Sequence, residues 1–196
     1  MILRCTNKLL AVIKPAQLAD SAPDREDWYA NLLWLGGRKC LLLTHAATLF
    51  TVFEPDVRAS GLRDPGRLVT GLIQRELERE HLPQDTFGVL EPGELVLAET
   101  ADRSVLGCMN DMAFLCEAAV DRSGGLASTG IGELNRSLRR NLNSARGYTP
   151  PIELTIQRLR VNIRWQVDRP VLLTGIRGEV RLPLSMMRGI VRWARA

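Results

Sequence analysis

Three apolar runs in close succession constrain the fold more than any other part of this chain. Residues 29–35 and 38–44 are separated only by Gly36-Gly37, and a third run covers residues 48–53. A Gly-Gly pair between two apolar runs is typical of a β-hairpin, because the favoured tight turn needs positive φ at both central residues. The pattern predicts a three-strand meander over 29–53. The segment 40–43 (Cys-Leu-Leu-Leu) lacks polar alternation, so its strand should be covered on both faces.

Segments of helical and strand periodicity flank this meander. Asp64-Pro65 is typical of a helix start, and Pro83 would end the helix. Further helices are predicted at 7–14, 105–120 and 133–142, and further strands at 1–5 and 94–99. We therefore expect an α+β fold with a mostly antiparallel sheet, seeded by the meander, and with helices packed on it.

The C-terminal part differs in pattern from the rest. Residues 159–167 alternate between apolar and polar side chains without a fault, which is typical of a half-buried strand. Segments 171–176 and 179–184 could pair with it, and residues 185–196 would form a terminal basic helix. We expect an α+β domain over 1–158 and a basic extension over 159–196, a small sheet and helix element. The apolar strand face makes this extension a candidate contact for a homo-oligomer.

Charge is distributed very unevenly along the chain. Residues 1–134 hold 13 Lys+Arg against 19 Asp+Glu, a net of −6, whereas residues 135–196 hold 13 Arg against three acidic residues, a net of +10. The guanidinium group binds phosphate and carboxylate through paired hydrogen bonds. This asymmetry points to nucleic acid or an acidic protein surface as partner, with simple solvation as the remaining alternative. The candidate nucleic-acid contacts are Arg136, Arg139 and Arg140, on a predicted exposed helix flank, with Arg146, Arg160 and Arg164.

An enzyme acting on a phosphorylated or nucleic-acid substrate is the competing interpretation. Its candidate catalytic residues would share a polar cleft: Lys8, Arg38, Lys39, Arg103 and Asp111. A lone carboxylate without a second acid or a histidine is thin support for acid–base chemistry. The simpler interpretation makes Arg38 and Lys39 a solvated turn, with Asn110 capping a helix whose first turn holds Asp111. The chain has no nucleophile elbow, zinc-protease or phosphate-loop motif.

Several classes of protein are disfavoured by composition. No apolar stretch approaches the roughly 18 residues of a membrane helix, and the N-terminus lacks the pattern of a signal peptide. The four cysteines are widely spaced and the chain has two histidines, so neither a metal site nor another cofactor is expected. The cysteines lie in apolar segments, which predicts buried free thiols and a reducing cytoplasm.

A set of short motifs follows in a fixed order along the first three quarters of the chain. They are RCTNKLL at 4–10, WYANLL at 28–33, RKC at 38–40, RSVLG at 103–107, ND at 110–111 and ELN at 133–135. In this the chain resembles a bacterial domain family of unknown function with RCTxKLL, WYANLL, RKC and RSVLGxMND motifs, over roughly residues 1–158. The resemblance implies a compact α+β domain of bacterial origin and leaves 159–196 outside the family pattern.

Charge and motifs together favour a bacterial, cytoplasmic, non-catalytic module that binds nucleic acid or associates with a nucleoprotein through its Arg-rich C-terminal third. The alternatives are an accessory or interaction subunit of a protein complex and the enzyme described above. A flat arginine surface would favour the first of these functions, and a cleft that gathers the candidate catalytic residues would favour the enzyme.

Overall fold

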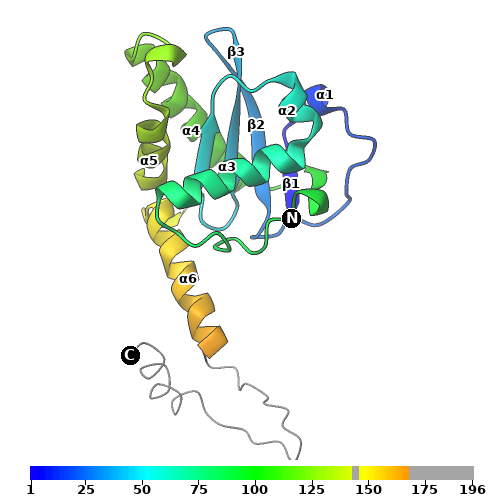
Figure 1. Cartoon of the computed structure of the whole chain (residues 1–196), viewed down its shortest axis with the longest axis vertical. Helices are drawn as coiled ribbons and strands as arrows, with labels where there is room; N and C mark the ends of the chain where they lie inside the picture. The colour runs from blue at the N-terminus through cyan, green and yellow to red at the C-terminus, as the bar shows by residue number, and fades with distance from the viewer. Residues whose placement is uncertain (143–145, 168–196) are drawn as a thin grey trace, which may run out of the picture. The chain divides into compact units, whose positions relative to one another are not determined.

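A computed structural model describes residues 1–142 and 146–167 of the protein, the last seven of them by their backbone alone. The chain divides into two compact units, Met1–Thr155 and Ile156–Ala196. The first unit contains one five-stranded sheet (Figure 1). Its strands are β1 (Ile2–Cys5), β2 (Trp28–Leu35), β3 (Arg38–His45), β4 (Thr51–Glu54) and β5 (Val96–Glu99), in the order β4-β3-β2-β1-β5.

The predicted meander is confirmed. Strands β2 and β3 pair antiparallel as far as Leu35 opposite Arg38, and β3 pairs antiparallel with β4. Gly36 and Gly37 have φ of 55° and 74°, as a two-residue hairpin turn requires. Strand β1 then joins β2 and β5 in parallel. The α+β class is confirmed, and the two antiparallel ladders hold most of the paired residues.

The described residues also form helices, and α3 begins at the Asp64-Pro65 signal predicted from the sequence. They are α1 (Asn7–Ile13), α2 (Ala59–Arg63), α3 (Pro65–Arg79), α4 (Arg103–Arg122), α5 (Ile131–Arg140) and α6 (Pro151–Val167), with short 3₁₀ turns η1 (Pro92–Glu94) and η2 (Leu126–Ser128). Pro65 opens α3, and the Asp64 carboxylate accepts the Arg67 amide at 3.1 Å. Asp102 caps α4 by accepting the Ser104 amide at 2.7 Å. The predicted cap at Asn110 is therefore wrong, because Asn110 lies inside α4.

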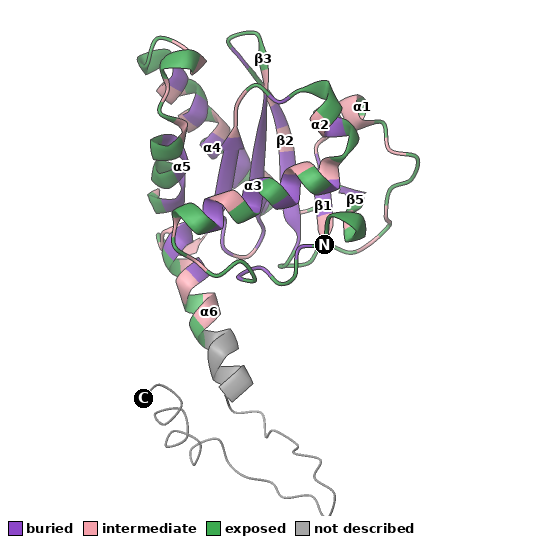
Figure 2. Cartoon of the chain, viewed as in Figure 1, coloured by how far each residue is buried: buried purple, intermediate pink, exposed green. Residues whose placement is uncertain are grey.

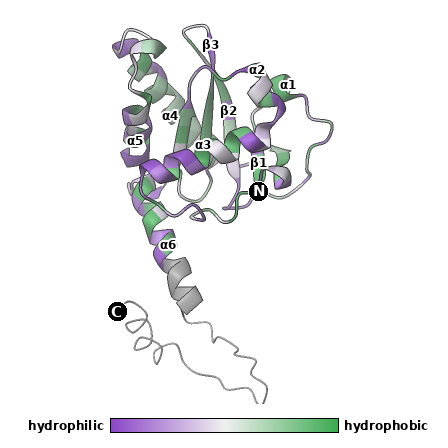
Figure 3. Ribbon diagram, viewed as in Figure 1, coloured by the Kyte–Doolittle hydropathy of each residue, from purple (hydrophilic) through white to green (hydrophobic). Residues whose placement is uncertain are grey.

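The core occupies both faces of the sheet. Cys40 and Leu42 of β3 pack against Met112 and Cys116 of α4. The alternate β3 side chains point to the other face and are also buried, and Figure 1 shows α3 crossing the strands on that side. Strands β1 to β4 are buried along most of their length (Figure 2) and largely hydrophobic (Figure 3), whereas β5 has Ala98 as its one buried residue. The prediction of a strand covered on both faces is confirmed.

The cysteines belong to this core. All four are free and buried, as predicted. Burial raises the pKa of the Cys5 and Cys116 thiols to about 12. Thiolate is the reactive form of cysteine, so these two side chains act as small apolar residues at neutral pH.

The predicted strand at 159–167 is wrong, because α6 continues through Val167. Along α6, apolar residues also recur at the spacing of a helix, at Ile152, Ile156, Leu159 and Ile163. The alternation over 159–167 therefore overlaps an apolar pattern of helical period. Pro151 occupies the first turn of α6, a favoured position for proline, and no helix breaker follows before Val167. The helix therefore propagates through the alternating residues. The predicted strands at 171–176 and 179–184 and the helix at 185–196 lie outside the described residues.

The outer edge of β4 is closed by a side chain. Asn135 of α5 accepts the Phe53 amide through Oδ1 at 2.6 Å, and its Nδ2 donates to the Phe53 carbonyl at 2.9 Å. The side-chain amide thus pairs with both backbone groups as a neighbouring strand would. An open strand edge invites pairing with other chains. Asn135, which belongs to the ELN motif, therefore has a structural role here.

We expect Asn135→Ala to lower the free energy of unfolding by about 1–3 kcal/mol, because it leaves buried backbone groups of Phe53 without partners. Urea titration followed by circular dichroism measures this change. The matched control is Asn110→Ala, which removes an exposed asparagine inside α4 and should stay within about 0.5 kcal/mol of the wild type. Equal effects of the two substitutions would show that the Asn135 amide does not stabilise the strand edge.

Candidate nucleic-acid interface

Helix α5 carries most of the candidate basic residues of the first unit, and its helical period places them on different faces of the helix. Leu134 and Leu138 enter the core beside α4. Asn135 and Arg139 are also buried, on the side of α5 that contacts β4. Ile131 is partly buried against the core, and the remaining positions, which include Arg136, Ser137 and Arg140, are exposed. Only this outer face of α5 can meet an external partner.

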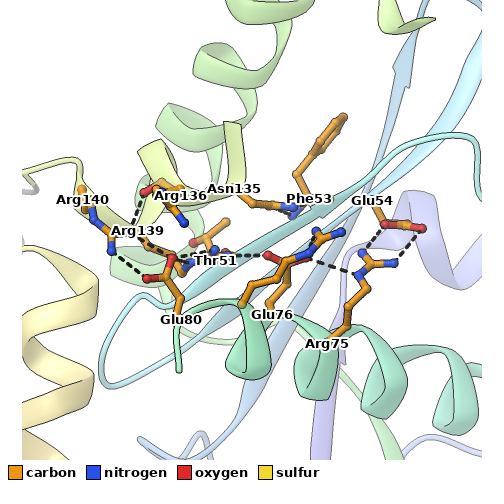
Figure 4. A network of polar contacts seen from close by, with 11 residues as sticks. Thr51, Phe53, Glu54, Arg75, Glu76, Glu80, Asn135, Arg136, Arg139 and Arg140 are labelled. Carbon is orange, nitrogen blue, oxygen red and sulfur yellow. Dashed lines mark hydrogen bonds and ion pairs between the residues drawn. The ribbon is translucent and has the colours of Figure 1, made fainter. Parts of the chain in front are cut away.

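Arg139 is the central cation of a buried network (Figure 4). Its Nη1 lies 3.0 Å from Glu76 Oε2 and its Nη2 lies 2.8 Å from Glu80 Oε1, both on or just after α3. The guanidinium also stands 5.0 Å from the ring centroid of Phe50. Its side chain is 1% exposed. The predicted exposed flank is therefore wrong for Arg139, whose donors are directed at the protein's own carboxylates.

Arg140 belongs to the same network but remains at the surface. Its Nη2 lies 2.7 Å from Glu80 Oε2 and its Nη1 lies 2.9 Å from Glu80 Oε1, so the ion pair is bidentate. Burial raises the pKa of the Glu80 carboxyl, but hydrogen bonds from Arg140 and Arg139 outweigh it, so the pKa lies below its usual value. The Arg140 side chain is 45% exposed. Glu80 thus holds a surface guanidinium in a fixed orientation.

Two adjoining hollows lie along the outer face of α5, and we call them together the α5 groove. The first, of about 320 Å³, lies between α4, the turn at Thr129 and Gly130, and α5, and the second, of about 400 Å³, lies over α5. The first is lined by Leu115, Ala119, Arg122, Ser123, Thr129, Gly130, Glu133, Leu134, Ser137, Leu138 and Asn141. The second is lined by Glu133, Arg136, Ser137, Arg140 and Asn141. Because they share Glu133, Ser137 and Asn141, the two hollows form one surface feature.

Arg146, the other predicted nucleic-acid contact of the first unit, does not line this groove. The Arg146 guanidinium donates to the backbone carbonyls of Ala46 at 2.7 Å and Ala47 at 3.2 Å. Arg160 is exposed in the second unit, and the Arg164 side chain lies outside the described residues. Of the predicted arginines in the first unit, Arg136 and Arg140 line the groove. Sequence reasoning missed Arg122, because nothing in the primary structure links the end of α4 to α5.

The candidate catalytic residues are distributed over several elements. Arg38 pairs with Asp56 at 3.3 Å on the surface, and the Lys39 ammonium lies 5.5 Å from the Trp34 ring centroid. Lys8, Arg103 and Asp111 are exposed on α1 and α4. Within the described part of the chain, no hydrogen bond or ion pair joins any two of these five candidate residues.

Two features of other protein classes are absent from the described residues. Within 1–142 and 146–167, no helix is both long and apolar enough to cross a membrane. Over the same ranges, no group of three or more His, Cys, Asp or Glu side chains is arranged to hold a metal ion.

Comparison with known proteins agrees with the resemblance stated above. No curated protein and no solved structure matches the chain. A family model does match, over residues 2–154, and its description is "Domain of unknown function (DUF6933)". The match covers most of the chain and ends inside α6. The chain therefore belongs to the DUF6933 family of domains of unknown function.

Proposed function

We propose that the chain is a non-catalytic nucleic-acid-binding module, and that the α5 groove is its contact surface within the described residues. The observation that carries this proposal is the arrangement of guanidinium side chains along one exposed groove, with Arg122, Arg136 and Arg140 in its lining and the Ser137 hydroxyl beside them. Arginine, serine, threonine and asparagine are among the side chains that contact phosphate and sugar.

The two arginines beside Ser137 have complementary properties. The Arg136 side chain is exposed, and within the described residues no carboxylate lies at ion-pair distance from it. Arg140 is oriented by Glu80, so little side-chain entropy would be lost when it meets a phosphate. The net charge of +10 over residues 135–196 would supply the long-range attraction to a polyanion.

Salt dependence of binding tests this proposal. Fluorescence anisotropy of labelled 12-nucleotide DNA should show binding by the full chain at about 50 mM salt, weakening steeply as salt rises. Arg136→Gln should reduce the slope of log affinity against log salt by about 1, the value for one lost phosphate contact. Arg139 is not a useful position for this test, because its substitution would disturb the core.

The matched control is Arg63→Gln, which neutralises an exposed arginine on α2, far along the chain from the groove. It changes net charge by the same amount and should leave the salt slope nearly unchanged. If the wild type binds neither single-stranded nor duplex nucleic acid at about 50 mM salt, the proposal is wrong. Equal effects of the two substitutions would place the contact surface elsewhere.

A further inference from the structure

The first hollow of the α5 groove has an apolar floor. Its deep residues are Leu115, Ala119, Leu134 and Leu138, all members of the core cluster between α4, α5 and the sheet or packed against it. The hollow has a volume of about 320 Å³, which is at the lower end for small-molecule sites. A flat apolar body of modest size would displace water from this floor favourably.

The rim of this hollow is rich in hydrogen-bond acceptors. The Ser123 hydroxyl donates to the Ala119 carbonyl at 2.8 Å, and the Thr129 hydroxyl donates to the Gly125 carbonyl at 2.9 Å. Their protons are committed within the protein, so each oxygen is left to accept. An ionised Glu133 can only accept. The rim therefore favours a ligand that carries N–H donors along the edge of its apolar body.

The second hollow instead favours a ligand group that accepts hydrogen bonds and is negatively charged, because Arg136 and Arg140 are charged donors in its lining. Glu133, Ser137 and Asn141 line both hollows, so a single ligand could occupy the two together. A nucleotide has this combination, since its base is flat, carries amino donors in most cases and is joined to a phosphate. Glu133 would repel a phosphate in either hollow, but in the second hollow the guanidinium groups of Arg136 and Arg140 oppose that repulsion, and in the first Glu133 would accept from the amino group of a base.

We propose that the α5 groove binds one unpaired nucleotide of a single strand, with an amino-bearing base in the first hollow and its phosphate at Arg136 and Arg140. The inference rests on the proposed function and makes it more specific. Adenine, cytosine and guanine carry exocyclic amino groups, and thymine does not. In a duplex the bases are stacked and paired, so entry of a base requires a single strand.

Binding of oligonucleotides of different base composition by the full chain tests this inference. At about 50 mM salt, 12-nucleotide oligo-dA and oligo-dC should bind roughly tenfold more tightly than oligo-dT or a duplex of mixed sequence. Glu133→Gln adds an amide donor to the rim and should reduce the discrimination against oligo-dT. Equal affinity of the wild type for oligo-dA, oligo-dC and oligo-dT would overturn the inference.

A variant that fills the hollow tests the position of the base. Ala119→Leu adds volume to the apolar floor without changing charge, and it should weaken oligo-dA binding by about tenfold, the effect of losing one base contact. Its matched control, Ala118→Leu, adds the same volume at a position that does not line the hollow. Equal effects of the two substitutions, with both variants folded by circular dichroism, would also overturn the inference.

Failure of this inference can be distinguished from failure of the proposed function. If the chain binds all oligonucleotides and duplex alike through Arg136, the base site is wrong and the nucleic-acid-binding function stands. If no nucleic acid binds at all, both are wrong.

Discussion

Arg139→Met should lower the free energy of unfolding by about 3–5 kcal/mol, the usual cost of removing one partner from a buried ion pair. Glu76 and Glu80 are 0% and 4% exposed, and each accepts from Arg139 within 3.0 Å. The substitution also removes the donor at 3.3 Å from the Thr51 carbonyl. Glu76 keeps contacts with Arg75 and Arg79, but among the described residues Glu80 is left with Arg140 as its one ion-pair partner. Urea denaturation measures the loss.

Arg140→Met is the matched control for this prediction. It removes a neighbouring arginine that binds the same carboxylate, but from a side chain that is 45% exposed. Exposed pairs typically contribute about 0–1 kcal/mol, so the control should remain near the wild type. A typical domain has only about 5–15 kcal/mol of net stability, and the two variants should therefore differ clearly in urea midpoint. A loss of less than about 1 kcal/mol for Arg139→Met would contradict the structural role of Arg139.

Arg4→Met should destabilise the protein to a similar extent, by about 3–5 kcal/mol. Arg4 is 2% exposed, and its Nε lies 2.5 Å from Asp27 Oδ2. Its other nitrogens donate to the carbonyls of Ala22 at 2.7 Å, Ser21 at 3.0 Å and Glu99 at 3.1 Å. One side chain thus ties the loop before β2 to β1 and to the end of β5. Limited proteolysis should cut this loop faster in the variant, in addition to the loss in urea stability.

Arg38→Met is the control for Arg4, because Arg38 also pairs with an aspartate beside the sheet, Asp56, but both side chains are 64% exposed. It should cost about 0–1 kcal/mol. The double variant Arg4→Met with Asp27→Leu should recover part of the loss, since no unpaired carboxylate is then left buried. If Arg4→Met and Arg38→Met cost the same, burial does not decide the strength of these pairs.

The strands and helices that the sequence predicted correctly are those whose signals are local. The Gly36-Gly37 turn, the Asp64-Pro65 helix start and the apolar stripe of α4 each depend on residues within a few positions of one another. Segment 159–167 shows where local signals fail. Nine alternating residues are compatible with a strand, but the same residues continue a helix that had already begun at Pro151, and propagating a helix is easier than starting a new element.

The candidate site likewise has some features that follow from local spacing in the sequence and others that depend on tertiary contacts. Helical spacing alone places Arg136, Arg139 and Arg140 on neighbouring positions of one helix, and this determined that α5 would be basic and amphipathic. Tertiary structure alone decided that Arg139 is buried, because its partners Glu76 and Glu80 lie 63 and 59 residues earlier in the chain. The groove likewise depends on the contact of α5 with the end of α4 and with the turn at Thr129 and Gly130. Long-range contacts of this kind leave no periodic pattern in the sequence. An arginine that pairs with a distant carboxylate has the same local spacing as an arginine on an exposed helix face.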